Sequence, residues 1–224
     1  MISEVFNIDC LDFMRTLPDG FFDLAIVDPP YGIGVANMNM GLGKGKKCSK
    51  AKNRNWTKKD WDDHRPTAEY FEHLNRVSVN QIIWGGNYFS LPASQYFAVW
   101  DKGEGMTGRD FAEAEYAWVK SGGTRIFKFN PVQKDRIHPT QKPIALYRWL
   151  LQNYAKSGFK IFDSHMGSQS SRIAAHDMGF DYWGCELDPD YFRDGNARFA
   201  EHIKKAELFT PAQQYHLPEQ PQLF

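Results

Sequence analysis

Cysteine is scarce in this sequence, with three residues in a chain of 224. Cys10, Cys48 and Cys185 are odd in number and far apart, which argues against a framework of disulfides and is typical of a reducing, cytoplasmic setting. The sequence contains no Cys-x-x-Cys pair and no spaced cluster of cysteine and histidine. It therefore offers no recognisable motif for a structural metal.

Long apolar runs and an excess of charge are also absent. No run approaches the roughly 18 residues that a membrane span needs, and the N-terminus lacks the features of a signal peptide. The 27 lysines and arginines balance the 27 aspartates and glutamates. A neutral chain does not bind polyanions indiscriminately, so any contact with nucleic acid requires positive charge that is gathered locally.

Positive charge is indeed gathered in one segment, which we call the basic loop and place at residues 32–66. Eight basic side chains lie between positions 44 and 59 without one acidic residue: Lys44, Lys46, Lys47, Lys50, Lys52, Arg54, Lys58 and Lys59. They are suited to phosphates, and Trp56 and Trp61 are suited to stacking on bases. A solvated surface loop with incidental lysines is the alternative.

Over its full length the chain is 42% apolar, which is enough to bury a core, and its length suits one domain over residues 1–224 with a C-terminal tail at 207–224. Short apolar runs predict strands at 22–27, 81–84, 96–100, 114–119, 160–163 and 182–186. Helical spacing follows at 67–79, 140–156, 170–178 and 189–205, with Thr140 and Asp188 as caps. This alternation predicts a mainly parallel α/β sheet that binds its ligand at the carboxyl ends of the strands.

The segment Asp28-Pro29-Pro30-Tyr31 directly follows the first of these strands. Neither proline has an N–H, so their carbonyls and the Asp28 carboxylate offer hydrogen-bond acceptors on a stiff backbone. Such acceptors suit an amino group, and the Tyr31 ring suits a nucleobase. A strand that ends in a proline-rich turn is the structural alternative. Asn87 and Tyr88, after the strand at 81–84, are further candidates for a base pocket, although core packing explains them equally.

Three further segments suit a nucleoside-like ligand. Gly167, in the turn after the strand at 160–163, permits close approach to the start of the next helix. Glu186 follows the next strand about 20 residues later, the usual position of an acid that binds ribose hydroxyls. Thr140 and Lys142, in the segment 138–143, are candidates for contact with a carboxylate. An ordinary turn and helix caps are the alternatives for these positions.

Together with Phe6-Asn7-Ile8-Asp9-Cys10, these segments resemble, in their order, the β-type amino-group DNA methyltransferases that carry an Asp-Pro-Pro-Tyr motif. The matching segments are 28–31, 138–143, 162–168 and 183–188, and with the segment at 6–10 they are spread over almost the whole chain, the basic loop excepted. The resemblance implies a Rossmann-like class I methyltransferase fold with a mixed seven-stranded sheet and helices on both faces. It also implies a strand at 6–10 whose Asp9 faces the cofactor adenine.

The same resemblance implies a function: transfer of a methyl group from S-adenosylmethionine to the amino nitrogen of an adenine that has left double-stranded DNA. The implied catalytic residues are Asp28, Pro29, Pro30 and Tyr31. The implied cofactor-binding residues are Asp9, Cys10, Asp28, Thr140, Lys142, Asp163, His165, Gly167, Ser168, Glu186 and Leu187. Homodimers are common in the family, and the compact size suits an orphan enzyme of a phage or prophage, whereas nothing in the sequence identifies a companion nuclease or the recognised site.

The chain departs from the family in two places. The family's cofactor turn has a phenylalanine and a second glycine where this chain has His165 and Gln169, and Gln169 is costly if its φ is positive but harmless inside the first turn of a helix. Only residues 121–137 are available for the usual target-recognition segment, so specificity is expected to lie partly in the basic loop or to be relaxed. Methylation of cytosine or of RNA, and a catalytically inactive DNA-binding module, are the alternative functions.

Overall fold

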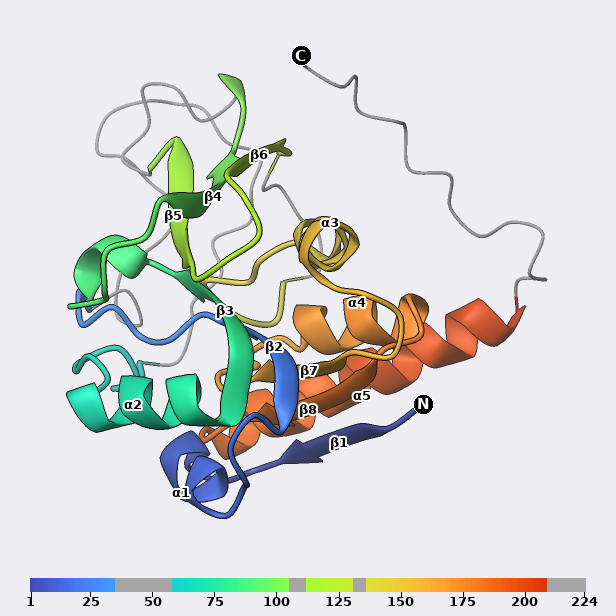
Figure 1. The fold of residues 1–224 in the computed structure, drawn as a ribbon. Helices are drawn as coiled ribbons and strands as arrows, with labels where there is room; N and C mark the ends of the chain where they lie inside the picture. The colour runs from blue at the N-terminus through green and yellow to red at the C-terminus, as the bar shows by residue number, and fades with distance from the viewer. Residues whose placement is uncertain (35–57, 105–111, 131–135, 209–224) are drawn as a thin grey trace.

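A computed structural model describes residues 1–34, 58–104, 112–130 and 136–208 (Figure 1). Its core is an eight-stranded sheet with the order β1-β8-β7-β2-β3-β5-β4-β6. The strands are β1 (Ser3–Phe6), β2 (Phe22–Val27), β3 (Ser78–Trp84), β4 (Tyr96–Asp101), β5 (Ala114–Val119), β6 (Arg125–Lys128), β7 (Lys160–Asp163) and β8 (Asp181–Cys185). All neighbouring pairs are parallel except β3·β5 and β4·β5, so β5 alone runs against the others.

Helices cover both faces of this sheet, as the alternating strands and helices predicted (Figure 1). They are α1 (Cys10–Arg15), α2 (Ala68–Val77), α3 (Ile144–Tyr154), α4 (Ser170–Asp177) and α5 (Pro189–Leu208), with a 3₁₀ turn, η2, at Gly86–Tyr88. Side chains alternate along β2 because successive residues of a strand point to opposite faces. Leu24 and Ile26 join the core under α3 and α4, whereas Ala25 and Val27 join the core under α1 and α2.

The expected fold class is confirmed, with corrections in detail. The sheet has eight strands rather than seven, because β6 pairs with β4 inside the stretch 121–137 that had been set aside for target recognition. The expected strand at 6–10 is wrong: β1 ends at Phe6, and Asp9 instead caps α1 by accepting the Leu11 N–H at 2.7 Å. The helix at 67–79 was drawn too long, since the chain passes directly from α2 into β3 at Ser78.

The two expected helix caps have different outcomes. Asp188 is confirmed, because its Oδ1 accepts the N–H groups of Asp190 at 2.9 Å and Tyr191 at 3.1 Å at the start of α5. Thr140 is wrong as a cap, since α3 begins at Ile144 after an extended Pro143. A residue before proline is disfavoured in the helical region, so the helix cannot start upstream of Lys142. Within the described part of the chain, no helix combines the length and the apolar character needed to cross a bilayer.

The parallel strands β1, β8, β7, β2 and β3 all present their carboxyl ends at one edge of the sheet. Asp28 follows β2, Asp163 ends β7 and Glu186 follows β8. The fold thus gathers at one edge three carboxylates that are far apart in the sequence, as expected for a ligand site in an open α/β sheet.

Candidate active site

A pocket of about 380 Å³ opens at this edge, within the size range of small-molecule sites. Its walls come from the segments after β1, β2, β7 and β8, from the end of the basic loop and from the turn before α3. Most of the expected cofactor-binding residues line it: Asp9, Cys10, Asp28, Thr140, Lys142, His165, Gly167, Ser168, Glu186 and Leu187. Asp163 does not line the pocket and is buried, 1% exposed, directly before the lining residues Ser164 and His165.

Asp28 is held by two donors. Tyr31 donates its hydroxyl to Asp28 Oδ1 at 2.6 Å, and Lys142 forms an ion pair with Asp28 Oδ2. Burial and the nearby Asp28 carboxylate raise the pKa of Tyr31 well above its usual value, which keeps the hydroxyl protonated as a donor. The Lys142 ammonium also pairs with Glu115 at 3.2 Å. Its expected contact with a cofactor carboxylate stays a prediction.

The backbone of Tyr31 is fixed by two residues from the end of the basic loop. Asp62, which is 1% exposed, accepts the N–H groups of Tyr31 at 2.7 Å and Gly32 at 3.0 Å. Arg65 donates to the carbonyl oxygens of Tyr31 at 2.9 Å and Tyr88 at 3.1 Å. The turn at Asp28–Tyr31 is thus held through both the N–H and the C=O of Tyr31.

The ring of Tyr31 is packed as firmly as its backbone. It stacks on Tyr88 with ring centroids 4.8 Å apart and an interplanar angle of 13°. Gly85 lies against the same ring with φ +67°, and a side chain there would overlap Tyr31. The strand-ending glycine is therefore needed for space, and Tyr88, an uncertain candidate from the sequence, is a direct neighbour of the catalytic motif.

The turn after β7 is tied to Glu186. Its carboxylate accepts the Gly167 N–H at 2.8 Å and the Asp188 N–H at 2.9 Å. Asp163 accepts the His165 N–H at 3.0 Å and the Ser171 hydroxyl at 2.5 Å. Burial outweighs these hydrogen bonds and raises the pKa of Asp163 to about 7. Burial also raises the pKa of Glu186. Positive charge that enters the pocket would therefore favour the ionised form of Asp163.

Gln169 has a positive φ, which answers the question that the sequence raised. It precedes α4 with φ 58° and ψ 29°, and among the described residues it is the one non-glycine in the left-handed region. Its side chain is fully buried, accepts a hydrogen bond from Arg172 at 2.9 Å and donates to the Phe192 carbonyl at 3.4 Å. The hydrogen bonds of the Gln169 side chain, which a glycine cannot make, thus offset the backbone strain.

Two histidines of the pocket are neutral. Burial lowers the pKa of His138 to about 3 and that of His165 to about 4. His165 Nδ1 lies 2.8 Å from Ser164 Oγ, and its ring contacts Tyr70. The neutral ring beside Ser164 suits the packing or cofactor-contact role expected for His165.

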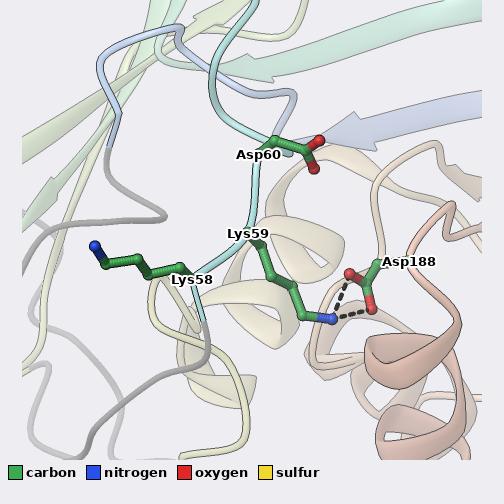
Figure 2. Close-up of a pocket in the computed structure, with 4 residues that line it drawn as sticks. All are labelled: Lys58, Lys59, Asp60 and Asp188. Carbon is green, nitrogen blue, oxygen red and sulfur yellow. Dashed lines mark hydrogen bonds and ion pairs between the residues drawn. The ribbon is translucent and has the colours of Figure 1, made fainter.

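Residues 35–57 of the basic loop lie outside the described residues, as does most of the tail at 207–224. The undescribed part includes Lys44, Lys46, Lys47, Lys50, Lys52, Arg54 and Trp56. Lys59 was expected to bind DNA, but it contacts both carboxylate oxygens of Asp188 at 2.6 and 2.5 Å and Asp190 at 3.0 Å (Figure 2). Lys58 and Lys59 line an open hollow with Asp60 and Asp188. Figure 2 shows Lys58 pointing away from Asp188. Lys58 is exposed and suits the expected role, whereas the charge of Lys59 is already matched by Asp188 and Asp190.

Trp61 has a different place from the one suggested by the sequence. It lines the pocket and packs against His138 with ring centroids 5.2 Å apart. Sequence reasoning also missed Glu115, Asp62 and Arg65. Asp62 and Arg65 lie more than 30 residues from Tyr31, and Glu115 lies far along the chain from Lys142, so no local spacing signals such contacts.

Comparison with known proteins agrees with this geometry. Residues 93–197 match a family of DNA methylases. A putative methylase of Escherichia coli K12, YubD, is 24% identical over 97% of this chain and 99% of its own length. Similar folds are found in the complex of M1.HpyAVI with SAM (TM-score 0.57, 18% identity, 88% of this chain and 100% of that one) and in the cytosine-N4-specific PvuII DNA methyltransferase (TM-score 0.55, 11% identity, 92% and 93%). The chain is therefore related to the N6/N4 DNA methylases and has the class I methyltransferase fold.

Proposed function

We propose that this protein is an S-adenosylmethionine-dependent DNA methyltransferase that modifies the exocyclic amino group of adenine. One observation carries the proposal: the Asp28-Pro29-Pro30-Tyr31 turn contributes to the same pocket as the turns after β7 and β8. A nucleobase amino group bound at the Asp28–Tyr31 turn would lie next to a methyl donor bound at the turns after β7 and β8. Binding both groups in line supplies much of the rate enhancement of such a transfer.

The pocket fits the proposed cofactor by its charge. Asp9, Asp28 and Glu186 line it, and both histidines are neutral, so its lining suits a cationic sulfonium and ammonium. Glu186 retains lone pairs for ribose hydroxyls while it orients Gly167. Ile8 and Leu187, 39% and 67% exposed, offer apolar cover for an adenine ring at the rim. Bound S-adenosylmethionine would supply an electrophilic methyl group.

The acceptor side consists of the Asp28 carboxylate and the Pro29 carbonyl. Hydrogen bonds from the target amino group to these oxygens would draw its lone pair out of conjugation with the ring and direct it at the methyl group. The base must leave the duplex to reach them, because a paired amino group is inaccessible. The proton lost after transfer would pass through the same acceptors to water.

The proposal of adenine rests on Asp28 at the first position of the motif, which favours adenine in the family that the sequence resembles. Cytosine is the second candidate, because the chain shares its fold with a cytosine-N4-specific enzyme. Both bases present an amino group beside a ring acceptor, so the acceptors at Asp28 and Pro29 suit either. Double-stranded DNA is the proposed partner, with the exposed Lys58 and the basic residues that precede it as the phosphate-binding groups.

The deciding experiment is transfer of labelled methyl groups from S-adenosylmethionine to mixed-sequence duplex DNA, followed by nucleoside analysis. We expect label in N-methyladenine with the wild type and a loss of more than about 100-fold with Asp28→Ala, because the principal acceptor is gone. Asp19→Ala is the matched control, since Asp19 is 82% exposed and outside the pocket. Label in cytosine would replace the proposed substrate. Absence of label in DNA, with cofactor bound to a folded protein, would overturn the function.

A further inference from the structure

Four charged side chains, each at most 26% exposed, form a row that ends at Asp28. Lys102 Nζ lies 2.7 Å from Glu115 Oε1, Glu115 Oε2 lies 3.2 Å from Lys142 Nζ, and Lys142 pairs with Asp28. The four residues come from four places in the fold: the ends of β4 and β2, the strand β5 and the turn before α3. Charges alternate along the row, so its net charge is zero.

Both inner members of the row are ionised; Lys142 is buried and Glu115 is partly buried. Burial opposes the charge of Lys142, but Asp28 and Glu115 outweigh it and raise the pKa of the ammonium. Burial likewise opposes the charge of Glu115, but Lys142 and Lys102 outweigh it and lower the pKa of the carboxyl. The Lys142 side chain is 4% exposed and its ammonium lies 5.3 Å from the centre of the Trp84 ring. Removing one such charge leaves its partner buried without compensation.

The row determines which Asp28 oxygen is available to a substrate. Lys142 occupies Oδ2, whereas Tyr31 occupies Oδ1 through its hydroxyl. Lys142 is paired with Glu115, which is paired in turn with Lys102. Within the described part of the chain, the Tyr31 hydroxyl has one hydrogen-bond partner, Asp28. Of the two donors, the single hydroxyl is the weaker competitor, because ion-paired hydrogen bonds are the stronger ones.

We propose that Glu115 is a positioning residue for methyl transfer, an inference that rests on the proposed function. Glu115 holds Lys142 on Asp28 Oδ2, which fixes the carboxylate plane and leaves Oδ1 as the acceptor that the target amino group takes over from Tyr31. Without Glu115, the Lys142 ammonium is free to move along the pocket wall that it lines, and Asp28 loses its fixed orientation. Glu115 itself does not line the pocket, so its effect on the reaction passes through Lys142.

A purely structural role of Glu115 predicts a different activity for a double variant. If Glu115 only neutralises Lys102, then removing both charges together repairs every consequence of removing one. The Lys102→Met/Glu115→Gln double variant therefore separates the two roles, because it leaves Lys142 and Asp28 as a neutral pair without the anchor behind Lys142. Coupling between residues in one ion-pair network is what such double variants measure.

The experiment compares wild type, Glu115→Gln, Glu115→Asp and the double variant in steady-state methylation of duplex DNA and in urea unfolding. We expect Glu115→Gln to lower kcat by about 10- to 100-fold, the scale of a small misplacement of a reacting group, with KM for S-adenosylmethionine little changed. Glu115→Asp keeps the charge and should restore part of kcat. The double variant should regain stability while its kcat stays low. Glu113→Gln, exposed and on the same segment, is the control.

The outcomes are distinct. A double variant that regains both stability and kcat would overturn the positioning role, as would a Glu115→Gln variant with wild-type kcat, and in both cases the proposed function would stand. A wild-type protein that transfers no methyl group to DNA would overturn the proposed function and this inference with it. Low kcat in the double variant at restored stability supports the proposal.

Discussion

At the scale of single residues, the most informative position is Gln169. The sequence left open whether this residue has a positive φ, and the structure places it in the left-handed region with a fully buried side chain. The amide fills the space beside Gly195, where an added Cβ would lie 2.7 Å from Gln169 Cγ. A non-glycine residue is kept at a strained position because its side chain joins the starts of α4 and α5.

Two substitutions at this position separate strain from side-chain contacts. Gln169→Ala keeps the strain and loses the hydrogen bonds to Arg172 and Phe192, so we expect a loss of about 2 to 4 kcal/mol in the free energy of unfolding. Gln169→Gly also relieves the strain and should be about 1 kcal/mol more stable than the alanine variant, yet still less stable than wild type. Urea unfolding measures all three. A glycine variant more stable than wild type would show that the side-chain contacts do not outweigh the strain.

Residues that follow a strand were the ones that the sequence located best. Asp28, Gly167 and Glu186 line the pocket as expected, because the end of a buried strand is readable from composition and determines which edge its next residue reaches. Asp9 also lines the pocket, but as a helix cap rather than on a strand. Lys142 lines the pocket as expected, and its role at a cofactor carboxylate stays a prediction. Its ion pairs with Asp28 and Glu115 were not foreseen, since they join segments that only the tertiary fold brings together.

At the scale of elements, the short segment 58–65 joins the two halves of the site. Lys59 reaches the start of α5 through Asp188, whereas Asp62 and Arg65 hold the turn after β2. An irregular segment of this kind has no periodic sequence pattern, so neither its path nor its contacts follow from the sequence. The strands β2, β3, β4, β5, β7 and β8 and the helices α2 to α5 were predicted to within a few residues because their apolar patterns are regular, whereas β1, β6 and α1 were not predicted.

Asp62 tests whether this segment matters for the reaction. We expect Asp62→Ala to lower kcat by about 10- to 100-fold, since Tyr31 and Gly32 lose their shared acceptor and the catalytic turn loosens. Asp62→Asn keeps an oxygen acceptor and should retain most of the activity. Affinity for S-adenosylmethionine, measured by calorimetry, should change little in either variant, because Asp62 does not line the pocket. Equal loss of activity in both variants would show that the charge, rather than the hydrogen bonds, is what the turn requires.

At the scale of the whole molecule, the buried Asp163 couples stability to pH. Its pKa is about 7 in the folded protein, above the usual value of 3.8, so folding favours the protonated form. The stability that this group contributes is fully present below about pH 4 and is lost as the pH rises through about 7. Asp163→Asn should therefore flatten the dependence of the unfolding free energy on pH across this window, as measured by urea unfolding at a series of pH values.

Cofactor binding should show the opposite dependence on pH, for the same reason. A cationic ligand in the pocket favours the ionised form of Asp163, so its binding should release protons between about pH 6 and 8 and tighten as the pH rises. His138 and His165, with pKa values of about 3 and 4, do not titrate in this window. Calorimetry of S-adenosylmethionine binding in buffers of different ionisation enthalpy counts the protons. Glu186, whose pKa is also raised, would account for any release that persists in Asp163→Asn, and an undiminished release in that variant would assign the effect to Glu186 instead.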